Sequence, residues 1–287
     1  MNRRDGKKLK VDAMHKLQIR FMPKRCDSDV FVNQKIDITN LVSYIEKYNK
    51  KNPEDKITYF HAFCTAIAKT VYNRPYLNRF IINKNFYERN NVSVAFAAKI
   101  SFEDSSREVL SVINVDDKDN ILTLRDKIKG RVNDIRKAKD DLGSTDKTME
   151  LLGKLPKHLL SFAAHIIKFL DNHDWLPKSI TSDSLYHSTV LLSNVGSIGG
   201  DALYHHLTDF GTNSILMTMG RIYKEEVVDE NGKKSLRSFC DFGVTLDERI
   251  ADGFYFIKSL RYFEEILNDP KLMLDPCDKK IVLKDKE

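Results

Sequence analysis

The chain has 287 residues, of which 41% are hydrophobic and 31% are charged. This balance is typical of a soluble globular protein that buries a sizeable core without disulfide or metal staples. The 47 Lys and Arg residues exceed the 41 Asp and Glu residues, and the net charge of +6 is mixed along the chain. A nucleic-acid-binding protein needs a concentrated basic face with base-stacking aromatic residues. The sequence indicates neither feature, so we expect no nucleic-acid partner.

The cysteines and the apolar segments indicate the compartment. No two cysteines form a CxxC pair, which argues against a zinc site and a disulfide framework and favours reduced thiols in a cytoplasmic protein. The basic N-terminus has no apolar run behind it, so no secretory signal is expected. The most apolar segment, residues 159–170, carries His165 and Lys168 and is too short to span a bilayer. The four cysteines are Cys26, Cys64, Cys240 and Cys277.

The predicted elements begin after an N-terminal arm, residues 1–25, that leads into a single domain over residues 26–287. In the first half of this domain, Thr39 and Thr58 stand where they can cap two helices. Threonine hydroxyls accept hydrogen bonds from the free N–H groups at a helix start. The predicted elements of this half are strands at 30–38, 92–100 and 109–115, a helix that starts at Thr39, and a helix over 59–72.

The second half begins with two helices of different character. The first, residues 121–150, is highly charged and is expected on a solvated outer face. Asn231-Gly232 is a two-residue hairpin-turn signal between two later strands. The remaining predicted elements are a helix at 155–170, strands at 189–193, 214–222 and 236–246, and a helix at 253–267. Intermixed strands and helices indicate an α/β protein, and no early strand leads into a glycine-rich turn of the dinucleotide-binding kind.

Three regions match one protein family in the same order along the chain. They are KIDITNL (35–41) with 57–78, LSNVGSIGG (192–200) with 215–222, and VTLDERIADG (244–253) with the helix after it. Together they resemble the catalytic domain of dihydrolipoamide acyltransferases, the core subunits of 2-oxo acid dehydrogenase complexes, and are similar to chloramphenicol acetyltransferase. The resemblance covers about residues 17 to 270 and implies the chloramphenicol acetyltransferase-like fold, a mixed sheet flanked by helices.

The resemblance implies a reaction and its residues. In this family a histidine, followed after three residues by Asp-Gly, removes the proton from the thiol of CoA or dihydrolipoamide. A serine or threonine hydroxyl stabilises the tetrahedral oxyanion, and the sites lie between the subunits of a trimer. Ser193 matches the oxyanion donor, and Glu248 stands at the histidine position. Asp252 matches an aspartate that is mainly structural and ion-paired to an arginine, for which Arg20, Arg25 and Arg249 are the candidates.

Glu248 is the main departure from the family pattern. An unperturbed glutamate has a pKa of about 4.3 against about 6.5 for histidine, so it is the poorer base for a thiol unless burial raises its pKa. Three hypotheses remain open: a CoA-dependent acyltransferase with Glu248 as an atypical base, a catalytically silent CoA-binding or trimeric assembly protein in which Glu248 pairs with a basic residue, and transfer in which His205 or His206 acts.

The expected partners and ligands follow from the same resemblance. We expect a homotrimer that uses acyl-CoA as a substrate. Only about 25 residues precede the matching region, and no lipoyl-type lysine turn is present. We therefore expect no lipoyl group on this chain, which would use free CoA thioesters or serve a lipoyl domain on another chain. His61 and His165 are expected to be core or flank residues, and no metal site is predicted.

Overall fold

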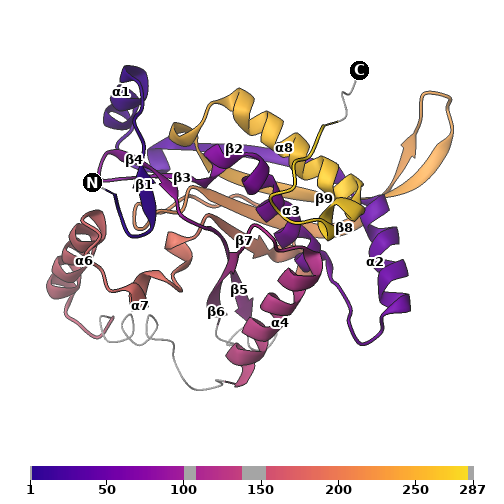
Figure 1. The fold of residues 1–287 in the computed structure, drawn as a ribbon, viewed down its shortest axis with the longest axis horizontal. Coiled ribbons are helices and arrows are strands. Elements are labelled where there is room, and N and C mark those ends of the chain that lie inside the picture. Colours follow the sequence, from indigo (N-terminus) through magenta and orange to yellow (C-terminus); the bar gives the residue numbers. More distant parts are fainter. Residues whose placement is uncertain (1, 100–107, 138–152, 284–287) are drawn as a thin grey trace.

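A six-stranded mixed sheet is the centre of the fold (Figure 1). The computed structural model describes residues 2–99, 108–137 and 153–283. The strand order is β2-β9-β8-β7-β5-β6; β7 pairs in parallel with β5 and β8, and the other pairs are antiparallel. The predicted α/β class with a mixed sheet is confirmed. The strands are β2 (Asp29–Asp37), β5 (Val92–Lys99), β6 (Glu108–Val115), β7 (Val190–Asn194), β8 (Ile215–Val228) and β9 (Lys234–Asp247).

Strands β8 and β9 form a long hairpin that reaches beyond the body of the sheet (Figure 1). Its tip is a five-residue connection, residues 229–233, and not the two-residue turn that the sequence predicts. The Asp229 carboxylate accepts hydrogen bonds from the backbone N–H groups of Asn231 and Lys233, and Gly232 adopts a left-handed φ of 75°. The Asp229 side chain therefore stabilises a five-residue loop, which is wider than the two-residue turn that Asn231-Gly232 predicts.

One face of the sheet carries the hydrophobic core. Side chains such as Leu192, Met217 and Val244 point to this face, and all three are less than 9% exposed. Helices α3 and α8 pack here, together with α2 and α4 (Figure 1). The described α-helices are α1 (Ala13–Phe21), α2 (Thr39–Lys51), α3 (Tyr59–Asn73), α4 (Ile121–Lys137), α6 (Lys157–Asn172), α7 (Lys178–Thr181) and α8 (Gly253–Asn268).

The two predicted threonine caps have different outcomes. The Thr58 hydroxyl accepts from the backbone N–H of His61, and the His61 ring accepts from the backbone N–H of Thr58, so α3 begins with a reciprocal capping box. The cap predicted for Thr39 is wrong. The Asp37 carboxylate accepts from both the backbone N–H and the hydroxyl of Thr39, and Thr39 becomes the first helical residue.

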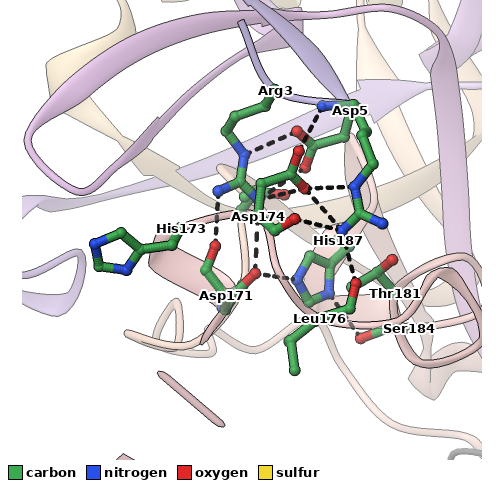
Figure 2. A network of polar contacts seen from close by, with 12 residues as sticks. Arg3, Asp5, Asp171, His173, Asp174, Leu176, Thr181, Ser184 and His187 are labelled. Atoms are coloured by element: carbon green, nitrogen blue, oxygen red, sulfur yellow. Dashed lines mark hydrogen bonds and ion pairs between the residues drawn. The ribbon is translucent and has the colours of Figure 1, made fainter. Parts of the chain in front are cut away.

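The N-terminal segment is folded against the rest of the chain. Strand β1 (Gly6–Lys8) pairs with β4 (Asn85–Arg89), which pairs with β3 (Arg79–Ile82) in a three-stranded sheet. Figure 2 shows how the segment is held: the buried Arg3 donates to the carbonyl of Asp171 at 2.7 Å and lies 3.6 Å from its carboxylate. Sequence patterns did not predict these short strands. The partner of β1 is distant in the chain, and the β3–β4 hairpin turns at Asn83 and Lys84, whose left-handed φ angles of 47° and 55° no glycine signals.

One further prediction is wrong, and part of another lies outside the described residues. The charged helix predicted over 121–150 is described as α4 only to Lys137, and residues 138–150 lie outside the described residues. Of the histidines expected in the core or at its flank, His61 is buried, but His165 is exposed on α6. The apolar side chains Phe162 and Phe169 of α6 are 65% and 52% exposed.

Candidate functional site

The second face of the sheet is polar and holds the candidate site. Ser193 lies near the end of β7, and its register partner on β8 is Thr218, whose own partner on β9 is Gly243. Residues that pair directly across strands point to the same face, so the Ser193 and Thr218 side chains share the face opposite the core. The segment after β7 crosses this face, and the Thr218 hydroxyl bonds to the backbone of Leu203 there.

Ser193 is half-buried, and its hydroxyl makes no hydrogen bond to another described residue. The turn after it is fixed locally: Asn194 caps a 3-10 helix over Val195–Ile198 by accepting from the backbone N–H of Ser197. Gly196 packs so closely on the backbone of Gly220 that any Cβ would overlap its carbonyl. The glycine therefore holds the turn against β8 while leaving the Ser193 hydroxyl available.

Glu248 begins a 3-10 helix, Glu248–Ile250, directly after β9. It is half-buried and forms no hydrogen bond or ion pair with any other residue that the structure describes. The preceding residue, Asp247, is fully buried and fixes this turn by accepting from the backbone N–H and the guanidinium of Arg249. Because Arg249 is engaged by Asp247 at 2.7 Å from each carboxylate oxygen, it does not pair with Glu248.

A second arginine completes this buried group. Arg25 lies 3.9 Å from the Asp247 carboxylate and donates to the carbonyls of Ile81 and Gly211, both at 3.0 Å. Burial lowers the pKa of the Arg25 guanidinium, and the Asp247 charge opposes that shift. One buried carboxylate thus stands between two guanidinium groups and sets the backbone from which Glu248 projects.

The arginine ion pair predicted for Asp252 is found at Asp247 instead. Asp252 is exposed and is the N-cap of α8, where its carboxylate accepts from the backbone N–H of Tyr255 at 2.7 Å. Among the three arginines considered, Arg25 and Arg249 surround Asp247, and Arg20 donates to a carbonyl of its own helix. The sequence could not separate these carboxylates, because Asp247 and Asp252 both flank the same turn.

Glu248 and Ser193 lie far apart within one chain. Gly243 stands on the register row of Ser193, and Asp247 lies four residues further along β9. Two strand spacings of about 4.8 Å and four residues of about 3.3 Å separate Ser193 from Asp247 by about 16 Å. A single copy of the chain therefore does not bring the predicted base and the predicted oxyanion donor together.

The adjacent residues His205 and His206 have different surroundings in the structure. His206 Nδ1 lies 3.0 Å from the carboxylate of Asp29, and the His206 ring makes an edge contact with Phe31 at 5.5 Å between centroids. His205 is exposed and makes no polar or ring contact within the described residues. Asp29 is the register partner of Asp247, so His206 lies at the end of β2 and β9 where Glu248 also begins. We call Asp29, Asp247, Glu248 and His206 the β2–β9 corner.

Sequence reasoning missed Asp29. The only available signal was an aspartate directly before the alternating strand at residues 30–38, and the partner histidine lies 177 residues away. Its side chain is 2% exposed. Burial raises the pKa of the Asp29 carboxyl, and the bonds from His206 and from the backbone N–H of Leu207 oppose the shift. A buried carboxylate beside an exposed imidazole is a charge pattern that only the folded chain reveals.

Metal sites and membrane-spanning helices are both absent from the described residues. No group of three or more His, Cys, Asp or Glu side chains comes together there in an arrangement that could hold a metal ion. None of the described helices combines the length and the apolar character that crossing a bilayer requires.

The fold and the polar sheet face define an acyltransferase architecture of the chloramphenicol acetyltransferase type. The structure of a chloramphenicol acetyltransferase aligns with a TM-score of 0.50 at 12% identity, over 92% of this chain and 98% of that one. The dihydrolipoamide acetyltransferase of Azotobacter vinelandii aligns with a TM-score of 0.61 at 15% identity, over 93% and 94% of the two chains. The predicted fold is therefore confirmed.

The sequence comparisons give the family. The model of the 2-oxoacid dehydrogenases acyltransferase catalytic domain matches residues 7–146 and 167–275, and the chain belongs to this family. A lipoamide acyltransferase component of the branched-chain alpha-keto acid dehydrogenase complex of Bacillus subtilis (strain 168) is 25% identical over 235 residues. The match covers 81% of this chain and 45% of that protein, so the chain spans about half the length of this relative.

Proposed function

We propose that this protein is a CoA-dependent acyltransferase that moves an acyl group between CoA and a thiol or hydroxyl acceptor. The observation that carries the proposal is the placement of the two family positions. Ser193 and Glu248 are both half-buried on or beside the polar sheet face, and neither is engaged by another described residue. A group that is to react with a substrate must be left free by its own chain, and both residues meet this condition.

Ser193 supplies the oxyanion donor in this proposal. Attack on a thioester carbonyl develops negative charge on the carbonyl oxygen, and a positioned hydroxyl stabilises that charge. In the Azotobacter vinelandii enzyme, a serine, a histidine and an asparagine four residues after it have roles in the catalytic mechanism. The same spacing separates Glu248 from Asp252 here, which supports Glu248 at the position of the base and Asp252 as the cap that anchors the following helix.

Glu248 is assigned the proton transfer by its sequence position. A carboxylate becomes a useful base for a thiol only where a dry environment raises its pKa. The engagement of Arg249 by Asp247 supports this assignment, because the cation that follows Glu248 in the sequence is already paired. In the competing hypothesis, a catalytically silent CoA-binding or assembly protein, Glu248 pairs with Arg249, a lysine or an adjacent subunit. No described residue of the same chain holds Glu248.

A homotrimer completes the proposed site. The separation of about 16 Å between the Ser193 and Asp247 positions means that the serine of one copy must meet the β2–β9 corner of another. The Bacillus subtilis relative is a component of a multienzyme complex, which supports a lipoyl domain on another chain as one possible acceptor. Coenzyme A acts as a substrate in this proposal.

The test is an assay of acyl transfer from acetyl-CoA to dihydrolipoamide or a small thiol, in which the released CoA is measured. Ser193→Ala is expected to lower kcat by roughly 10²- to 10³-fold, because one oxyanion donor is lost. Glu248→Gln removes the base at the family position and keeps the side-chain volume. A wild-type protein that binds CoA but transfers no acyl group to any thiol or hydroxyl acceptor would refute the enzyme and favour the silent assembly protein.

A further inference from the structure

We infer that His206, oriented by Asp29, is the catalytic base of this chain. The inference rests on the proposed acyl transfer and moves the proton-accepting role from Glu248 to the imidazole. Both groups lie in the β2–β9 corner, so either would meet the Ser193 hydroxyl of a neighbouring copy. The histidine that is missing at position 248 would then be supplied from a different loop, between β7 and β8.

The Asp29 contact determines which nitrogen of His206 is free. A carboxylate can only accept hydrogen bonds, so Nδ1 of His206 carries the hydrogen in the 3.0 Å contact with Asp29. The lone pair of a neutral imidazole is then on Nε2. The His206 side chain is 76% exposed and Asp29 is 2% exposed, so the orienting carboxylate is buried while the basic nitrogen faces outward. This is the arrangement in which an aspartate orients a catalytic histidine.

The other described histidines are placed differently. His187 is buried, and its two nitrogens contact Ser184 and Asp171 (Figure 2), so neither nitrogen is free. His61 uses Nδ1 to cap α3 from inside the fold. His15 also contacts a carboxylate, but its partner Asp12 is three residues away, 63% exposed and caps the same helix. Only His206 among these joins a distant buried carboxylate to an exposed ring.

The surroundings of His206 suit an acceptor molecule. Phe31 contacts the rings of both Tyr204 and His206 at 5.5 Å between centroids, and Phe31 and Tyr204 are each 45% exposed. These rings form an apolar surface beside the basic nitrogen. The second oxygen of Asp29, Oδ1, is buried without a hydrogen-bond partner. Its uncompensated charge favours the imidazolium that forms when Nε2 takes a proton.

The proposed step conserves protons and electrons. Nε2 of His206 takes the proton of the acceptor thiol or hydroxyl as that sulfur or oxygen attacks the thioester carbonyl. The bond between the acyl carbon and the CoA sulfur then breaks, and the imidazolium returns the proton to the departing thiolate. The products are the acylated acceptor and free CoA, and His206 is again neutral.

The experiment compares two neighbouring histidines. His206→Gln keeps a side-chain amide that can donate to Asp29 but cannot take a proton, and kcat is expected to fall by roughly 10²- to 10⁴-fold. His205→Gln is the matched control. Its kcat is expected to stay within about twofold of wild type, because His205 is a surface residue without polar or ring contacts to the described residues.

Asp29→Asn tests the positioning role separately. The asparagine amide can donate to Nδ1, which moves the hydrogen to Nε2 and removes the basic lone pair, so kcat should fall at least tenfold. Nitrogen-15 NMR of the His206 ring should show hydrogen on Nδ1 in the wild type and on Nε2 in Asp29→Asn. A His206 ring that Asp29 does not orient would keep the same tautomer in both proteins, and a fall in kcat together with the changed tautomer assigns the effect to the orientation of the ring.

The outcomes are distinguishable. If His206→Gln behaves like His205→Gln while Glu248→Gln abolishes transfer, His206 is not the base and the proposed acyltransferase stands with Glu248. An unchanged tautomer in Asp29→Asn would also overturn the inference. If the wild type shows no transfer at all, the proposed function fails and this inference fails with it.

Discussion

At the scale of single residues, the site depends on which carboxylate each cation engages. Three acidic residues lie within the six-residue stretch 247–252, and the structure gives each a different environment. Asp247 is buried between Arg25 and Arg249, Glu248 is half-buried without a described partner, and Asp252 caps a helix at the surface. Burial and hydrogen bonding, and not residue type, therefore decide which carboxylate is structural and which is available for chemistry.

Asp247→Asn should strongly destabilise the protein. The variant leaves two guanidinium groups buried without their carboxylate, and removing one partner of a buried ion pair costs about 3–5 kcal/mol. Urea unfolding followed by circular dichroism measures the loss. The matched control is Asp201→Asn, whose partner Arg221 lies at 2.9 Å but whose side chain is 72% exposed; its cost should stay below about 1 kcal/mol. Equal losses for the two variants would contradict this account.

His61 should make stability depend on pH. Burial lowers the pKa of His61 to about 4, with Lys129 and Arg125 adding to the shift. The folded state therefore binds the proton later than the unfolded state, whose histidine titrates near 6.5. The stability from this group is present above about pH 6.5 and is lost as the pH falls towards 4, by about 3 kcal/mol in total.

His61→Gln keeps an acceptor for the Thr58 backbone and removes the titration. The unfolding free energy of the variant should change less than that of the wild type between pH 6.5 and 4. A comparison of urea midpoints across this interval checks the prediction. Parallel pH profiles for the two proteins would show that His61 is not the group responsible.

At the scale of elements, local signals and long-range pairing contribute differently. Helix α3 was predicted from Thr58 and the apolar side that follows, and it begins and ends within one residue of the predicted range. Its start is encoded locally, because a threonine hydroxyl three residues before a free N–H group makes a cap without help from the rest of the chain. Strand β4 has no comparable signal and exists because β1 and β3 lie beside it.

Thr58→Ala should lower the unfolding free energy by about 1 kcal/mol, because the first turn of α3 loses its hydroxyl acceptor. Thr58→Ser retains that hydroxyl and should lose less than half as much. Thermal or urea unfolding of the two variants provides the measurement. An alanine variant as stable as the wild type would mean that packing alone fixes the start of the helix.

At the scale of the whole molecule, the polar face of the sheet explains the proposed assembly. Helices cover the opposite face, and the Ser193 end and the β2–β9 corner of this face are too far apart to act within one chain. A cyclic assembly places the serine of each copy against the corner of the next, so that every site is shared between two copies. The proposed trimer would have three times the 33.2 kDa mass of the chain.

Mixed trimers test this shared site directly. Chains with Ser193→Ala and chains with both Glu248→Gln and His206→Gln should each be inactive alone. After co-refolding in equal amounts, about a quarter of the sites would combine an intact serine with an intact corner, because the interfaces of a closed ring join different surfaces. Recovered transfer of this order supports the assembly. Light scattering that shows only monomers, or a mixture without activity, would contradict it.

The sequence by itself determined the fold class and the order of the main elements, because periodicity, helix caps and short motifs are local properties of the chain. Its resemblance to the acyltransferase family selected Ser193 and Glu248 as candidate site residues. The tertiary structure decided the electrostatics. It assigned the arginine pair to Asp247, made Asp252 a cap, left His165 exposed and joined Asp29 to His206 across 177 residues. Contacts of this kind depend on strand register and on burial. Neither property can be predicted from the local sequence around a residue, because the contact partners are far apart in the chain.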